Sequence, residues 1–390
     1  MSTKNKKVMV VGGGIAGLTA AWELSQFNID VELIEKTPFL GGYAIQYCCK
    51  ATDECRQCGA CTVEAMLKNV VNEPKIKVHL ATEVGKINNS GRFSVDLKKS
   101  SYKPDSAKEG VIRGSPLHVI VDKEICKKNP DVCPEDAVEL DKIGFSGKLD
   151  VDAVILASGF QPFDAEQKGT YGYKKFPNVV TGMDLERIIR ENATVVRPSD
   201  GKTVQKIAFI QCVGSRDENL GNLWCSQVCC PYALRMAERI KHKNTDAEIT
   251  VFYMDIQNVG KDYAGFYEKC KKDFRFIRNI PVDVFPMENG SLSMRYMNEE
   301  DGLCINEEFD LLVLSVGITP GPDNSNMSDL FDVGLNEDGF FAGIDKLNST
   351  STIKDGIFLA GTVAGPKDIA ASMAHAGQAA SEVIKHLGVS

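Results

Sequence analysis

The sequence is poor in histidine, lacks a net positive charge and contains no long apolar run. Five histidines occur in 390 residues, and none falls in a recognisable metal-ligand spacing. The net charge is −8 with a pI near 5.4, which argues against a nucleic-acid-binding surface, since phosphates require lysine and arginine. No segment reaches the roughly 20 apolar residues of a membrane-spanning helix, and residues 1–7 do not resemble a signal peptide. We therefore expect a cytoplasmic protein that meets a membrane only through partners.

Cysteine, by contrast, is abundant and clustered. Of the thirteen cysteines, five lie between residues 48 and 61, two at 126 and 133, four between 212 and 230, and single ones at 270 and 304. Disulfide frameworks belong to small secreted domains, whereas short cysteine spacings in a long chain are typical of metal binding. The pattern therefore indicates a reducing compartment and metal centres.

The fullest metal-binding pattern lies between residues 212 and 230. The apolar run 206–210 predicts a buried strand that leads Cys212 into a loop. Four thiolates can complete the coordination of a 4Fe-4S cluster or of a zinc ion, although adjacent cysteines are unusual for structural zinc. We predict a 4Fe-4S cluster, with zinc as the alternative, on Cys212, Cys225, Cys229 and Cys230.

A second pattern lies between residues 48 and 61. Cys55, Cys58 and Cys61 form C-x2-C-x2-C, the opening spacing of bacterial ferredoxin ligands. Either Cys48 or Cys49 could provide a fourth thiolate. A second cluster is the hypothesis for this segment, and structural zinc and free thiols are the alternatives.

A dinucleotide-binding pattern begins the chain. The strand-like run 8–11, the glycine motif G-x-G-x-x-G and the helical pattern 18–25 are followed by a second strand that ends in an acid. Such glycines let the backbone approach a pyrophosphate at a helix N-terminus, and the acid accepts hydrogen bonds from a ribose. The candidate residues are Gly12, Gly14, Ile15, Ala16, Gly17 and Glu35.

Four further segments resemble the flavoproteins with two dinucleotide-binding domains: 36–42, 81–84, 152–159 and 356–361. The resemblance spans nearly the whole chain and implies FAD as the cofactor. Thr362 stands where thioredoxin reductase-like enzymes usually have an aspartate that binds the ribityl chain. The FAD contacts that the resemblance implies are Lys36, Gly41, Gly42, Val84, Ala157, Ser158, Gly159, Gly361 and Thr362.

Residues 365–369 and the spacing of the four cysteines from 212 to 230 resemble the A-type subunit of heterodisulfide reductase. The resemblance implies that Lys367 lies near the flavin and tunes its potential, and that the helix 370–386 points its positive N-terminal end at the flavin. A surface position for Lys367 is the alternative. The further contacts implied are Pro366, Asp368 and Ile369. The short form resembles the sulfur-oxidation type, with the A-type subunit of quinone-interacting membrane-bound oxidoreductase as the alternative.

These observations predict an α/β fold of two Rossmann-like domains. The FAD domain would comprise residues 1–160 and 310–390, and the cluster-bearing domain residues 161–309. Residues 97–145 resemble an insertion with a degenerate ferredoxin-like outline, in which Cys126 and Cys133 cannot hold a cluster unaided, although either could lend a ligand to a neighbouring one. Cys270 and Cys304 are expected to be ordinary thiols.

The second domain departs from nicotinamide-dependent relatives in the turn after its first strand. Residues 211–215 contain one glycine and a cysteine, which cannot form the same phosphate cradle. We therefore expect a FAD and iron-sulfur electron-transfer subunit with a homodimer core, in a complex with heterodisulfide reductase B- and C-like subunits in sulfur or anaerobic energy metabolism.

Three other functions stay open at this point. One is a quinone-interacting oxidoreductase subunit that exchanges electrons with adenylylsulfate reductase. Another is an NAD(P)H-dependent disulfide or ferredoxin reductase. The third is a scaffold with a structural flavin.

Overall fold

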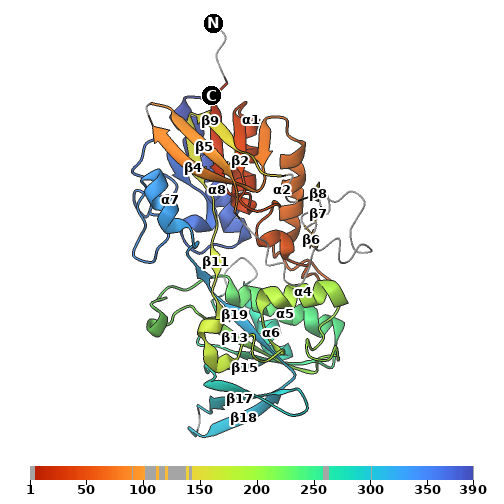
Figure 1. Cartoon of the computed structure of the whole chain (residues 1–390). Coiled ribbons are helices and arrows are strands. Elements are labelled where there is room, and N and C mark those ends of the chain that lie inside the picture. Colours follow the sequence, from red (N-terminus) through yellow and green to blue (C-terminus); the bar gives the residue numbers. More distant parts are fainter. Residues whose placement is uncertain are drawn as a thin grey trace. The chain divides into compact units, whose positions relative to one another are not determined.

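The computed structural model describes residues 5–89, 91–101, 111–113, 119–121, 138–139, 143–257, 263–299 and 301–389. The chain divides into two units, each with its own sheets (Figure 1). The first unit comprises Met1–Ile45, Gly59–Phe160 and Pro320–Ser390, and the second comprises Gln46–Cys58 and Gln161–Thr319. Within the described ranges, no helix has the length and apolar character needed to cross a membrane.

The first unit is built on a parallel five-stranded sheet in the order β21-β10-β1-β2-β3. Val8, Met9 and Val10 of the central strand are fully buried, as expected for a parallel strand that is covered on both faces. The strands are β1 (Lys7–Val11), β2 (Asp30–Ile34), β3 (Ile76–His79), β10 (Ala153–Leu156) and β21 (Ile357–Leu359).

Helices cover one face of this sheet and a small antiparallel sheet covers the other. Leu18 of α1 and Ala376 of α8 share a core with Val8 and Val10, whereas Met9 packs on the opposite side with residues of β5 and β9. The helices on the first face are α1 (Ile15–Gln26), α2 (Ala60–Asn72) and α8 (Ile369–Leu387), and the antiparallel strands are β4 (Thr82–Asn89), β5 (Phe93–Lys99) and β9 (Gly147–Val151). Helix α7 (Asn324–Phe331) packs on the side of the antiparallel sheet, where Phe331 joins the core around Met9.

The second unit repeats this construction. Its parallel sheet has the order β12-β19-β13-β14-β15, with α4, α5 and α6 on one face and the antiparallel strands β16, β17 and β18 on the other. The parallel strands are β12 (Val179–Thr181), β13 (Lys206–Val213), β14 (Glu248–Phe252), β15 (Arg275–Ile277) and β19 (Leu311–Val316). The other elements are α4 (Gly182–Asn192), α5 (Cys229–Lys243), α6 (Tyr263–Asp273), β16 (Asp283–Pro286), β17 (Leu292–Met297) and β18 (Cys304–Phe309), with the short pair β11 (Gln161–Pro162) and β20 (Ile318–Thr319).

The two sheets correspond strand by strand. In each unit the first strand of the βαβ motif, β1 or β13, is the middle strand, with its second strand beside it and the helix α1 or α5 between them in sequence. The turn after β13 is therefore the counterpart of the glycine turn after β1. The predicted pair of Rossmann-like domains is confirmed, and the turn with Cys212 occupies the nucleotide-binding position of the second domain.

Two predicted boundaries are corrected. The predicted FAD domain included residues 46–58 and resumed at residue 310. Residues 46–58 belong to the second unit because they make hydrogen bonds and ion pairs with α4 and α5. β19 also belongs there, because it pairs with β12 and β13 in the centre of the second sheet.

One strand end also differs from the prediction. β13 continues to Val213, with a register shift after Ile210. Thr82 and Val84 lie at the start of β4, and Cys304 is the first residue of β18.

Only part of the predicted insertion at 97–145 is described. The backbone forms β6 (Val111–Arg113), β7 (Val119–Val121) and β8 (Val138–Glu139) in one small sheet. The predicted ferredoxin-like outline, with Cys126 and Cys133, lies outside the described residues.

Candidate functional site

The three motif glycines of the first unit differ in what a side chain at each position would contact. Gly12 has φ of +110°, and a Cβ there would lie 2.3 Å from the carbonyl oxygen of Ala157. A Cβ on Gly17 would lie 1.8 Å from the carbonyl oxygen of Gly12, so the helix packs directly on the turn. A Cβ on Gly14 would meet no atom within 4 Å. Gly14 is thus the position where a ligand can approach the backbone, as in dinucleotide-binding turns.

Glu35 supports this turn from the end of β2. Its carboxylate accepts hydrogen bonds from the backbone N–H of Gly13 at 2.6 Å and of Thr37 at 2.7 Å. Burial raises the pKa of Glu35, and these backbone donors oppose that shift. The side chain therefore holds the glycine turn together, a role that the sequence prediction of a ribose contact did not include.

Several predicted FAD contacts lie around the same turn. The backbone N–H of Gly41 donates to the carbonyl of Gly13 at 2.7 Å, and a Cβ on Gly42 would lie 3.2 Å from the Cα of Gly14. Gly361 packs against Ala16, since its Cβ would lie 2.5 Å from that of Ala16. Ala157 and Ser158 lie beside Gly12. The segments after β2, β10 and β21 thus converge on one turn.

The remaining predicted contacts have other partners or lie elsewhere. Lys36 forms an exposed ion pair with Asp323 at 2.6 Å, and Asp368 caps α8 by accepting from the backbone N–H of Ala371 at 2.7 Å. Gly159 is open, with φ of +81° and no atom near a Cβ position. Among the others, Ile15 and Thr362 are buried, whereas Val84, Pro366 and Ile369 are half-buried.

His375 of α8 fixes the turn that contains Gly361. Its Nδ1 accepts from the backbone N–H of Gly361 at 3.0 Å, and its Nε2 lies 3.0 Å from the hydroxyl of Ser349. Burial, together with the charge of Lys367, lowers the pKa of His375 to about 4. The ring is therefore neutral at pH 7, with Nδ1 free of a proton.

Lys367 is half-buried and makes no salt bridge with a carboxylate in the described part of the chain. Its Nζ donates to the carbonyl of Gly365 at a long 3.4 Å. Burial lowers the pKa of the amine. The amine thus lies close to His375, and its position beside the flavin stays a prediction.

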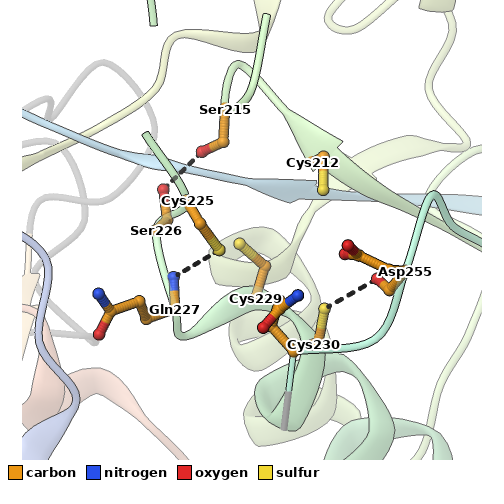
Figure 2. A pocket seen from close by; sticks show the side chains of 9 residues that line it. Cys212, Ser215, Cys225, Ser226, Gln227, Cys229, Cys230 and Asp255 are labelled. Carbon is orange, nitrogen blue, oxygen red and sulfur yellow. Dashed lines mark hydrogen bonds between the residues drawn. The ribbon is translucent and has the colours of Figure 1, made fainter. Parts of the chain in front are cut away.

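The second unit brings Cys212, Cys225, Cys229 and Cys230 to one pocket (Figure 2). The four sulfur atoms point toward the same space in Figure 2. Ser215, Ser226, Gln227, Asp255 and Gln257 complete its lining.

The four cysteines come from three local geometries: a strand, a loop and a helix start. Cys212 lies at the register shift of β13 with φ of +59°, a left-handed conformation that turns its side chain out of the regular strand pattern. Cys225 lies in the following loop and accepts the backbone N–H of Gln227 at 3.3 Å. Cys229 and Cys230 are the first two residues of α5, whose N-terminus has no side-chain cap. Free N–H groups and the helix dipole at this end favour negative charge.

The protonated thiols of this pocket are costly to ionise without a metal. Burial raises the pKa of Cys229 well above its usual value, and repulsion from the other three thiolates adds to the effect. Burial likewise raises the pKa of Cys230 to about 12. Burial also raises the pKa of Cys212, although the guanidinium of Arg216 opposes this shift. Four thiolates in one pocket, two of them buried, therefore need metal cations to neutralise them.

No three described histidine, cysteine, aspartate or glutamate side chains are close enough together to hold one metal ion. A zinc ion with Zn–S bonds of about 2.3 Å would hold its sulfurs only about 3.8 Å apart. In a cubane cluster each thiolate binds a different iron atom, so the sulfurs stay farther apart. The donor set of four thiolates at one pocket therefore suits a 4Fe-4S cluster, with zinc as the alternative.

The cysteines between residues 48 and 61 differ in their contacts and exposure. Cys48 contacts Glu186, while Cys49 and Cys55 are exposed and accept the backbone N–H of the residue two positions later at 3.4 Å. Cys58 belongs to the second unit and Cys61 lies in α2 of the first unit. Cys270 is fully buried in the core of the second unit, where burial raises its pKa to about 12, and Cys304 is exposed.

Glu186 organises this segment on α4. The fully buried Glu186 accepts hydrogen bonds from the ammonium of Lys50, which is 2% exposed, and from the hydroxyl of Tyr232 at 2.9 Å. Lys50 also lies over the rings of Tyr47 and Tyr232, 4.9 and 5.3 Å from their centroids. Sequence reasoning missed this network, because its members are far apart in the chain and none forms a motif.

Known proteins resemble both the chain and its fold. The NAD(P)-binding Rossmann-like domain family matches residues 10–59. The chain is 34% identical to the second iron-sulfur A-type subunit of CoB–CoM heterodisulfide reductase from Methanopyrus kandleri. It is 31% identical to the A-type subunit of the H(2):CoB-CoM heterodisulfide,ferredoxin reductase from Methanothermobacter thermautotrophicus. Each alignment covers 96% of this chain and 63% of the relative. The chain is thus similar to A-type subunits of heterodisulfide reductases over most of its length. It spans just under two thirds of the length of these relatives.

The fold also resembles that of solved structures. The thioredoxin reductase of T. acidophilum matches with a TM-score of 0.58 at 15% identity, covering 98% of this chain and 99% of that one. The thioredoxin reductase of Lactococcus lactis matches with a TM-score of 0.57 at 16% identity, covering 99% of both chains. These matches confirm the predicted thioredoxin reductase-like arrangement of two Rossmann-like domains.

Proposed function

We propose that this chain is the flavin-bearing electron-transfer subunit of a heterodisulfide reductase-like complex, with FAD in the first unit and a 4Fe-4S cluster in the second. One observation carries the proposal: four cysteines surround a pocket at the turn where a nicotinamide-binding domain would hold its pyrophosphate. The relatives at 34% and 31% identity, which are named as A-type subunits of heterodisulfide reductases, support it.

The residues of the first unit fit FAD. The open backbone at Gly14 and the uncapped N-terminus of α1 suit a pyrophosphate. The segments with Gly42, Ser158 and Gly361 meet at the same turn. Bound FAD would supply both two-electron and one-electron chemistry. Lys367 would place a positive charge where it stabilises a reduced flavin, and His375 would hold the Gly361 turn as a neutral acceptor.

The residues of the second unit fit a cluster. Cys212, Cys225, Cys229 and Cys230 are the proposed ligands, the uncapped N-terminus of α5 favours their negative charge, and the N–H of Gln227 donates to Cys225. A 4Fe-4S cluster would supply one-electron transfer. Single electrons would then leave the flavoprotein through the cluster in this pocket.

A second cluster is proposed on Cys49, Cys55, Cys58 and Cys61. Cys49 is preferred over Cys48, because its sulfur is exposed and accepts an N–H bond as the sulfurs of Cys55 and Cys225 do. The sulfur of Cys48 instead donates to a buried carboxylate.

The proposed partners follow from the relatives. Subunits resembling heterodisulfide reductase B and C would exchange electrons with this chain, and a homodimer core in the cytoplasm is proposed with them. The A-type subunit of a quinone-interacting oxidoreductase would use the same two cofactor sites, and its partner would distinguish it. An NAD(P)H-dependent disulfide or ferredoxin reductase is disfavoured, because the turn after β13 has Gly214 as its one glycine, and a Cβ there would lie 2.0 Å from the ring of Phe163.

Anaerobic purification with visible spectra and iron analysis tests the proposal. We expect flavin bands above a broad iron-sulfur absorbance, and no rapid bleaching by NADPH. Cys225→Ser should keep the flavin bands and lose the part of the broad absorbance that belongs to one cluster, whereas Cys304→Ser, at an exposed thiol, should keep both in full. Rapid bleaching by NADPH in a protein without iron would establish the reductase instead.

A further inference from the structure

We propose that Arg216 and Asp255 form a charge pair that sets the reduction potential of the cluster in the four-cysteine pocket. The inference rests on the proposed 4Fe-4S cluster and concerns two residues that no cluster motif includes. Both are potential-tuning residues that act on the cluster through their charge.

Arg216 lies between two of the cysteine-bearing segments. It follows Cys212 in the same turn with φ of +55°, and its backbone N–H donates to the carbonyl of Trp224 at 3.1 Å. This bond ties the turn after β13 to the loop that contains Cys225. The guanidinium is close enough to oppose the burial that raises the pKa of Cys212, and the charges of Cys212 and Cys225 help to raise the pKa of Arg216. A permanent positive charge therefore lies beside two of the four proposed ligands.

Asp255 forms another side of the same pocket. It follows β14, and its backbone carbonyl lies 3.9 Å from the sulfur of Cys230. Its carboxylate accepts from Nη1 of Arg216 and lines the pocket in Figure 2. The two side chains are 30% and 44% exposed, so water screens each charge only in part.

The sign of a charge near a cluster decides whether the reduction potential of the cluster rises or falls. Reduction adds one negative charge, so a nearby cation stabilises the reduced state and raises the potential, while a nearby anion lowers it. Arg216 and Asp255 act in opposite directions, and together they are neutral. Removal of either one should therefore shift the potential, and removal of both should restore it.

The test is an EPR-monitored redox titration of the anaerobically reconstituted full chain. Arg216→Gln should lower the midpoint potential of the cluster and Asp255→Asn should raise it. The double variant should return near the wild-type value, and Arg216→Lys should remain close to it because the charge is kept. Arg295→Gln is the matched control, since Arg295 pairs with Asp283 in the same unit on β16 and β17, away from the cysteine pocket.

The outcomes separate this inference from the proposed function. An intact cluster whose potential is unchanged in Arg216→Gln and Asp255→Asn overturns the charge-pair role and leaves the cluster in place. A wild-type chain that carries no cluster signal overturns both. If Arg216→Gln fails to fold, Asp255→Asn alone decides, and a potential that falls or stays constant in that variant contradicts the inference.

Discussion

The thiol of Cys48 donates a 2.7 Å hydrogen bond to Oε2 of Glu186, and the backbone N–H of Cys48 donates to the same oxygen at 2.9 Å. The sulfur of Cys48 is therefore hydrogen-bonded to a buried carboxylate, while the neighbouring sulfur of Cys49 is exposed. We expect Cys48→Ser to keep the iron of the second cluster, because a serine hydroxyl can donate to Glu186 in the same way. Cys49→Ser should lose the iron of one cluster per chain. Iron analysis of both variants after anaerobic reconstitution measures the difference, and iron loss in Cys48→Ser alone would reverse the assignment.

The ion pair between Lys50 and Glu186 predicts a large loss of stability when it is broken. Both side chains are buried, so Lys50→Met leaves an unpaired carboxylate in the core of the second unit. Removing one partner of a buried pair costs roughly 3–5 kcal/mol of the free energy of unfolding. Lys174→Met is the control, because Lys174 and Glu166 form an exposed pair worth about 0–1 kcal/mol. Urea denaturation compares them, and equal midpoints for the two variants would contradict the network's role.

The glycine turn predicts that two substitutions separate folding from cofactor binding. A Cβ on Gly14 meets no protein atom, whereas one on Gly17 would lie 1.8 Å from a backbone oxygen of Gly12. Gly14→Ala should therefore fold as stably as the wild-type apoprotein but retain less FAD after purification. Gly17→Ala should lose both stability and FAD. Flavin per chain and thermal denaturation of the apoproteins measure this, and undiminished FAD in Gly14→Ala would place the ligand elsewhere.

His375 predicts a loss of stability on acidification. Its folded pKa is about 4 against an ordinary value of 6.5, so the native state binds fewer protons than the unfolded state. The contribution of the neutral ring is complete above about pH 6.5 and is lost as the pH falls toward 4. The free energy of unfolding of the wild type should fall more between about pH 7.5 and about 4.5 than that of His375→Gln. Parallel declines in urea midpoint for the two proteins would show that His375 does not titrate in this way.

Local patterns predicted much of this molecule. The G-x-G-x-x-G motif lies in a strand–turn–helix context and packs as that motif requires, because its constraints act within a few residues. The four cysteines from 212 to 230 were likewise predictable, since a strand, a loop and a helix start deliver them from one short stretch.

The contacts that lie outside those motifs were not predictable. Residues 46–58 were assigned to the FAD domain by their position in the chain, yet Cys48 contacts Glu186, 138 residues later. Arg216 and Asp255 are 39 residues apart, and no spacing pattern in the sequence predicts their contact beside the cysteine pocket. Such contacts depend on how helices pack on the second sheet, and residue spacing does not predict that packing.

The most direct test of the central claim is the amount of iron, acid-labile sulfide and zinc per chain in anaerobically reconstituted wild-type protein and in Cys229→Ser. Cys229 is buried at the start of α5 and lines the pocket. The account predicts that Cys229→Ser loses iron and sulfide together, in the amount of one 4Fe-4S cluster, while FAD content stays the same. Unchanged iron and sulfide in Cys229→Ser, or zinc in place of iron in the wild type, would contradict it.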